Sequence, residues 1–189
     1  KLKIDDDTVV ISYFGRLVPE KGVHLLIKAL DQVQNKNWVF LIDEFSRYKT
    51  DYQAKIDGLI EQSNFKEKTI FFEANHTEIA NYMNASDIAI LPSIPTKKWI
   101  EQYGRVVPEA MACGNRLIIS NEGAQQDFFE SDYEFKYSPL DENALIQLIE
   151  KAIKESQQNR LDRSKFVISA HQNFSLNAQI ECFKNALFT

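Results

Sequence analysis

Two acidic residues flank the expected start of a helix in the stretch WIEQYGRVVPEAMACG, residues 99–114. Glu101 and Glu109 have seven residues between them, which include Gly104 and Arg105. A carboxylate has two acceptor oxygens and can bind a vicinal diol, such as those of sugars and riboses. Backbone amides at a helix start bind phosphate, and a glycine permits close approach. The stretch therefore suits a diphosphate ligand with a diol on each side. The alternative is that Glu109 only complements the helix dipole and Glu101 is only solvated.

A second set of charged residues follows the first expected strand, in YFGRLVPEKG, residues 13–22. Gly15 permits a sharp turn, Arg16 lies at the carboxyl end of the strand, and Lys21 lies in the first turn of the next expected helix. A lysine there opposes the helix dipole, and an anion bound between them would remove that conflict. Arginine offers a planar fork to phosphate oxygens and lysine a point charge. The stretch predicts a diphosphate site, unless both are surface charges beside a turn.

Other phosphate and metal motifs are missing from the sequence. Neither GxGxxG nor GxxxxGK[ST] occurs, so the dinucleotide fingerprint and the P-loop are both absent. No Asp-x-Asp stands at the end of an expected strand, and no His/Cys cluster occurs. The three histidines, His24, His76 and His171, are scattered, and no catalytic role is assigned to them. The absence of these motifs fits a protein that uses neither a metal ion nor a cofactor.

The elements that must position these residues alternate between apolar runs and amphipathic segments. The apolar runs predict six strands, at residues 8–14, 38–42, 68–73, 86–93, 115–120 and 133–138. Helices are expected at residues 19–33, 47–64, 76–85, 104–113, 142–157, 160–172 and 176–187. Continuous apolar strands between helices are typical of a doubly wound, Rossmann-like parallel sheet with helices on both faces. Ligands of such α/β sheets bind beyond the carboxyl ends of the strands. We expect one domain over residues 1–189.

Net charge, the length of apolar runs and the cysteines indicate which partners and which compartment to expect. The net charge of −5 argues against a nucleic-acid partner. No apolar run approaches about 18 residues, so no transmembrane segment is expected. Cys113 and Cys182 lie in no metal or redox motif, which predicts free thiols in a reducing compartment, with a disulfide between them as the alternative. These features favour a cytoplasmic location.

The two charged stretches together resemble the donor-binding, carboxyl-terminal half of GT-B-fold retaining glycosyltransferases, of glycosyltransferase family 4, also called group 1. The resemblance rests on GRLVPEKG at 15–22, on the E-x7-E spacing and on EAMACG at 109–114. SDIAILPS at 86–93 and the tail NFSLNAQIECF add to it, so it spans nearly the whole chain.

The resemblance implies a role for each residue. Arg16 and Lys21 would hold the donor's diphosphate and neutralise it as a leaving group. Glu109 would bind the ribose hydroxyls, and Glu101 those of the transferred sugar. The amides around Tyr103 and Gly104 would contact the sugar or its phosphate. The catalytic candidates are thus Glu101, Arg16 and Lys21; Gly15, Tyr103, Gly104, Arg105 and Glu109 complete the donor site. The resemblance implies no metal.

The resemblance also implies partners outside this chain. The family's acceptor-binding half precedes the donor half, and nothing here resembles it. We expect a nucleoside-diphosphate sugar donor, a glycan or lipid-linked acceptor reached through that other half, and a role in bacterial surface polysaccharide synthesis. The alternatives are a non-catalytic nucleotide-sugar-binding module and a GT-B enzyme of other chemistry, such as an epimerase. A peripheral position at the inner face of the membrane is a further expectation for the full-length protein.

The sequence departs from the family pattern at several points. The turn after the second strand, IDEFSRY at 42–48, lacks the usual glycines, and Glu73 replaces a common glycine after the third strand. Both turns border the donor cleft in the family, so the resemblance does not extend to recognition of the base. Arg105 stands where an aliphatic residue is more usual.

Overall fold

The computed structural model describes residues 2–44, 50–158 and 163–188. Its centre is one parallel sheet of six strands in the order β3-β2-β1-β4-β5-β6. The strands are β1 (Val9–Tyr13), β2 (Trp38–Asp43), β3 (Thr69–Phe72), β4 (Ile88–Leu91), β5 (Arg116–Ser120) and β6 (Lys136–Tyr137). The predicted α/β fold with a parallel sheet is confirmed.

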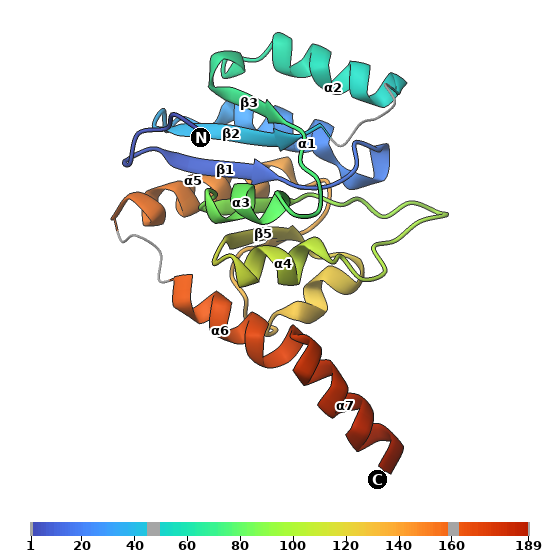
Figure 1. Ribbon diagram of the computed structural model, residues 1–189. Coiled ribbons are helices and arrows are strands. Elements are labelled where there is room, and N and C mark those ends of the chain that lie inside the picture. Colours follow the sequence, from blue (N-terminus) through green and yellow to red (C-terminus); the bar gives the residue numbers. More distant parts are fainter. Residues whose placement is uncertain (1, 45–49, 159–162, 189) are drawn as a thin grey trace.

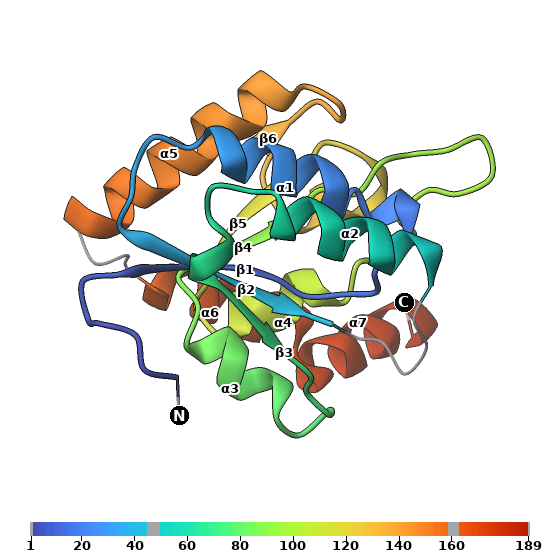
Figure 2. The same cartoon turned by 90° about the horizontal axis from the view of Figure 1, so that it is seen from above.

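Helices cover both faces of the sheet (Figures 1 and 2). One face packs on α1 (Val23–Gln32), α2 (Asp51–Glu61) and α5 (Glu142–Gln158). The other face packs on α3 (Ile79–Asn84), α4 (Val106–Ala112) and α6 (Arg163–Phe174). The last helix, α7 (Leu176–Phe188), extends away from the sheet (Figure 1). None of the described helices is long and apolar enough to cross a membrane.

The central strands are apolar on both sides because each side faces a separate core. Along β1, Val9, Ile11 and Tyr13 belong to the core beneath α1, α2 and α5, whereas Val10 belongs to the core on the opposite face. Side chains of a strand alternate between faces, so a strand buried on both is largely apolar. This explains why these strands were recognisable as mainly apolar runs. The exception in β1 is the buried Ser12, whose hydroxyl donates to the Ile88 carbonyl at 3.2 Å.

The first helix begins later than its amphipathic pattern predicts. A 3-10 turn, η1 (Pro19–Lys21), precedes α1, and Gly22 between them has a φ of 67°. A right-handed helix cannot pass through a residue in this left-handed conformation. A Cβ on Gly22 would also lie 1.9 Å from the carbonyl oxygen of Pro92. Lys21 therefore lies in η1, outside α1.

Other differences concern the extents of elements. The polar helix predicted over 47–64 is observed as α2, and the glycine-free turn at 42–48 lies mostly outside the described residues. The sixth strand is only two residues long. Two further 3-10 turns, η2 (Lys66–Lys68) and η3 (Gly123–Phe128), were not predicted. Cys113 and Cys182 are both free.

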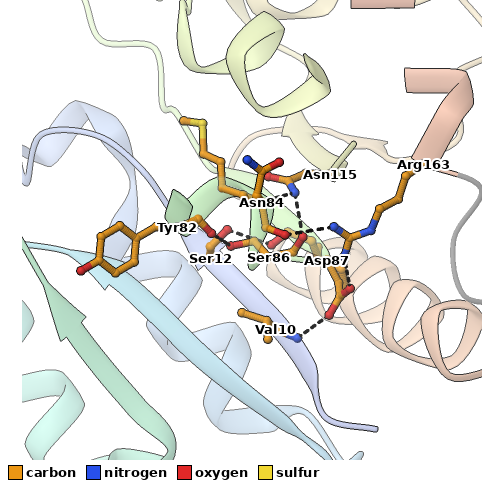
Figure 3. Close-up of polar contacts among 10 residues, drawn as sticks. Val10, Ser12, Tyr82, Asn84, Ser86, Asp87, Asn115 and Arg163 are labelled. Atoms are coloured by element: carbon orange, nitrogen blue, oxygen red, sulfur yellow. Dashed lines mark hydrogen bonds and ion pairs between the residues drawn. The ribbon is translucent and has the colours of Figure 1, made fainter. Parts of the chain in front are cut away.

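A polar network attaches α6 to the amino-terminal side of the sheet (Figure 3). The carboxylate of Asp87 accepts a hydrogen bond from the backbone amide of Val10 at 2.8 Å and pairs with the Arg163 guanidinium at 2.5 Å. Arg163 also donates to the carbonyl of Asn84 at 3.2 Å. Asn115, fully buried, donates to two carbonyl groups at the end of α3, each at 2.8 Å. Asp87 thus joins β1 to α6.

We expect Asp87→Ala to lower the free energy of unfolding by about 1–3 kcal/mol, because it leaves the Val10 amide and the Arg163 guanidinium without their acceptor. Urea denaturation near neutral pH measures the change. The control is Glu181→Gln, which removes an exposed ion pair within α7 and should leave stability nearly unchanged. Equal stability of the two variants would contradict the role given to Asp87.

Candidate functional site

The candidate site lies where the direction of the sheet reverses. β1 and β4 are neighbours, with β2 and β3 beyond one and β5 and β6 beyond the other. The loops that leave β1 and β4 therefore diverge to opposite sides at the carboxyl edge. Open α/β sheets bind ligands at such a switch point. The residues predicted to bind a diphosphate follow β1, and those predicted to bind a sugar follow β4.

Lys21 and Glu101, 80 residues apart in the sequence, form an ion pair at this point. The Lys21 ammonium group contacts the Oε2 atom of Glu101, and the Ser93 hydroxyl donates to the same oxygen at 3.3 Å. The ammonium group also lies 5.3 Å from the centre of the Trp99 ring, within the range of a cation–π contact. The side chains of Lys21 and Glu101 are 20% and 10% exposed. Two residues predicted to share a site thus meet directly.

The backbone at Glu101 is fixed by the segment that follows β5. The amide of Ala124 donates to the Glu101 carbonyl at 2.9 Å. Gly123 has a φ of 64°, and a Cβ on it would lie 2.4 Å from the same carbonyl oxygen. No other residue type fits this approach without displacing the Glu101 loop. Gly123 therefore positions Glu101, a role that no pattern in the sequence predicted.

A buried chain of hydrogen bonds supports the same loop. The Ser120 hydroxyl donates to the Ser93 carbonyl at 2.6 Å. The Gln125 amide nitrogen donates to the Ser120 carbonyl at 2.7 Å and contacts its hydroxyl at 2.5 Å. All three side chains are buried. The sequence carried a weak signal for the two serines, namely polar residues at the carboxyl ends of two apolar strands, and none for Gln125.

Arg16 lies at the same end of β1. Gly15 before it has a φ of 142°, and the buried Tyr13 hydroxyl donates to the Arg16 carbonyl at 2.8 Å. Burial raises the pKa of Tyr13 well above 10.0, and the negative charges of Asp43 and Glu101 raise it further, whereas Arg16 lowers it. Tyr13 therefore stays a hydrogen-bond donor to the Arg16 turn.

The turn before α4 contains a glycine in the left-handed conformation. Gly104 has a φ of 65°, and the amide of Val107 donates to its carbonyl at 2.8 Å. A Cβ there would meet Glu101 and Gln125 only at 3.6 Å, so the glycine is required by conformation and not by crowding. Tyr103 is half exposed, with its ring edge against Phe128. Arg105 is exposed at the start of α4.

Glu109 lies apart from the Lys21–Glu101 pair. Within the described residues, no hydrogen bond or ion pair joins it to either of them. It lies at the surface in the first turn of α4, but protein atoms cover part of its carboxyl group. This burial raises the pKa of Glu109 above its ordinary 4.5, while nearby Arg105 and His76 lower it. The structure therefore joins Lys21 and Glu101 directly and holds the backbone of Arg16 at the same edge of the sheet. Glu109 lies in the first turn of α4, and no hydrogen bond or ion pair within the described residues joins it to the pair.

No cluster of three or more His, Cys, Asp or Glu residues suited to a metal ion occurs in the described parts of the chain.

The half-buried His24 bonds through Nδ1 to the Tyr52 hydroxyl at 2.7 Å, which places it between α1 and α2.

The family model described as "Glycosyl transferases group 1" matches residues 1–168. Among curated relatives, the lipopolysaccharide 1,2-N-acetylglucosaminetransferase of Salmonella typhimurium is 23% identical over 95% of this chain and 48% of its own length. The glycogen synthase of Mycobacterium tuberculosis is 31% identical over 59% of this chain and 25% of its own.

Solved structures share the fold. The Anabaena protein HepE in complex with UDP has a TM-score of 0.79 and 25% identity, over 96% of this chain and 50% of its own. The carboxyl-terminal domain of a group 1 glycosyl transferase family protein, LpcC of Francisella tularensis, has a TM-score of 0.74 and 20% identity, over 89% of this chain and 87% of its own. The chain thus spans about half the length of the HepE chain and of the Salmonella relative.

We expect Gly123→Ala to lower the free energy of unfolding by about 1–3 kcal/mol, because alanine is strained at this φ and its methyl group would displace the Glu101 carbonyl. Urea denaturation measures the loss. Gly58→Ala is the matched control: Gly58 lies within α2 with nothing within 4 Å of its Cβ position, so alanine should be neutral or stabilising. Similar losses in both variants would contradict the role of Gly123.

The raised pKa of Glu109 predicts a pH-dependent difference between wild type and Glu109→Gln. A carboxyl group with a raised pKa favours folding below its unfolded value, and this contribution is lost as the pH rises through the folded value. Since glutamine does not titrate, it has no such contribution to lose, and the variant should gain stability relative to wild type between about pH 4 and pH 7. Urea denaturation at both pH values tests this, with exposed Glu130→Gln as control. Parallel pH profiles for the two variants would overturn the assignment.

Proposed function

Because the chain belongs to the group 1 glycosyl transferases, we propose that it is the donor-binding domain of an enzyme that transfers a sugar from a nucleoside-diphosphate sugar. The acceptor is a glycan or a lipid-linked glycan, bound by a further half of the protein outside residues 1–189. The observation that carries this proposal is the meeting of Lys21 and Glu101 at the switch point of the sheet. Lys21 is a cation suited to the diphosphate of such a donor, and Glu101 is an anion suited to the hydroxyl groups of its sugar.

Each predicted residue has a task in this proposal. Arg16 and Lys21 contact the diphosphate and stabilise the negative charge that develops on it as the bond to the anomeric carbon breaks. Glu101 accepts hydrogen bonds from hydroxyls of the transferred sugar, and Glu109 from those of the ribose. The turn at Tyr103, Gly104 and Arg105 places backbone amides and a cation beside the donor.

The finer features of the enzyme are also proposals. We place it in glycosyltransferase family 4, with retention at the anomeric carbon and without a metal ion, since two cations can do for the leaving group what a metal ion otherwise does. The residues 1–189 alone bind donor but transfer little sugar, because a second half is needed to exclude water and orient the acceptor. The name of the Salmonella relative supports a role in bacterial surface polysaccharide synthesis. Such an enzyme works in the cytoplasm or at the inner face of the membrane.

Two alternatives keep the same donor site, namely a non-catalytic nucleotide-sugar-binding module and a nucleotide-sugar epimerase. Incubation of the full-length protein with a labelled nucleotide sugar separates them. Transfer to an acceptor, with the donor's anomeric configuration retained by NMR, supports the proposal. Interconversion of two nucleotide sugars without acceptor would support the epimerase, and binding without turnover the module.

We expect the 189-residue chain to bind a nucleoside diphosphate without added Mg²⁺, and Arg16→Ala to weaken binding by about 1–3 kcal/mol through loss of a charge-assisted hydrogen bond. Calorimetry against UDP, GDP and ADP measures both, and UDP comes first because HepE was solved with it. Lys154→Ala, at an exposed position of α5, is the control for loss of one positive charge. Equal affinities of Arg16→Ala and wild type would contradict the assignment.

A further inference from the structure

The ion pair between Lys21 and Glu101 means that the proposed phosphate ligand already has an anionic partner within the protein. The same Glu101 oxygen also accepts the Ser93 hydroxyl, and the Trp99 ring lies beside the ammonium group. A diphosphate that binds Lys21 must therefore compete with a carboxylate that is held in place. Under the proposed function, the competing carboxylate, Glu101, itself binds another part of the donor, the transferred sugar.

The two partners differ in their freedom to move. Glu101 is fixed at its backbone by Ala124 and Gly123 and at its side chain by Ser93. Lys21 lies in a short 3-10 turn and carries its charge on a four-carbon chain with many rotamers. When a ligand separates the pair, Lys21 moves and Glu101 stays.

The cost of that separation depends on what replaces Lys21 at Glu101. The Glu101 side chain is only 10% exposed, and a largely buried carboxylate that loses a charged partner is strongly disfavoured. Hydroxyl groups of a bound sugar can donate hydrogen bonds to it and restore what is lost. A free nucleoside diphosphate has no hydroxyl beyond its terminal phosphate and restores nothing there.

We propose that the Lys21–Glu101 pair makes this pocket select the intact nucleotide sugar over the nucleoside diphosphate that remains after transfer. Glu101 is then a specificity residue with two opposite effects, because it lowers the affinity for the free diphosphate and raises that for the sugar-bearing donor. The inference rests on the proposed function and adds to it a reason for product release.

Calorimetry on Glu101→Gln tests the inference, since glutamine keeps the shape and removes the charge. The probes are UDP, GDP and ADP, each paired with its glucose conjugate, on the 189-residue chain without added metal ions. We expect Glu101→Gln to bind the preferred free diphosphate about fivefold more tightly than wild type does and the glucose conjugate less tightly. The ratio of the two affinities should thus fall by about tenfold or more.

Two further variants identify the cause. Lys21→Met removes the cation for which Glu101 and the diphosphate compete, so Glu101→Gln in that background should no longer change the affinity for the free diphosphate. Asp127→Asn, at an exposed position of η3, controls for the loss of one negative charge and should change neither affinity. Circular dichroism and urea denaturation of each variant establish that it is folded.

Each outcome decides a different claim. If the wild type binds a diphosphate but Glu101→Gln binds it equally or more weakly, the selectivity role is overturned and the proposed function stands. A similar gain with Asp127→Asn would also overturn it, because the effect would be one of overall charge. If the folded wild type binds none of the six probes, the proposed function fails and the inference fails with it.

Discussion

The site depends on the close approach of two backbone segments at the centre of the sheet. Gly22 lies so near the Pro92 carbonyl that a side chain there would overlap it, and the amide of Ile94 donates to the Glu20 carbonyl at 2.8 Å. These contacts join the turn after β1 to the loop after β4, which come from segments far apart in the chain. They place Lys21 beside Glu101 through the backbone, before any attraction between the two charges acts.

A third segment completes the arrangement from the other half of the sheet. The turn after β5 holds Glu101 at its carbonyl, and Ser120 and Gln125 hold Ser93 beneath it. The charged groups therefore rest on buried, hydrogen-bonded loops from β1, β4 and β5 together. The Glu101 carboxylate is thereby fixed before a ligand arrives, and only the flexible Lys21 side chain has to move.

The sequence contained enough to predict the fold class and to place Lys21 and Glu101 in one site. Apolar runs such as 38–42 mark strands buried on both faces, and Gly104 and Gly114 mark the ends of α4. Two sequence features predicted the location of the site, namely the spacing of Glu101 and Glu109 and the cations Arg16 and Lys21. The sequence did not reveal Ser93, Trp99 or Gly123, since their roles arise from contacts between loops that no local pattern records. It also misplaced the start of α1, because the left-handed Gly22 is set by its contact with Pro92.

The loop between Ser93 and Glu101 is fastened at both ends, by Ile94 to the turn after β1 and by Glu101 to the turn after β5. Between these points the chain forms a small hairpin closed by the bridge between Thr96 and Trp99, with Lys97 and Lys98 exposed at its tip. The length and the residue types of this tip can therefore change with little effect on the anchored carboxylate. The same anchored framework would let related chains differ in the residues at this rim while the carboxylate beneath it stays in place.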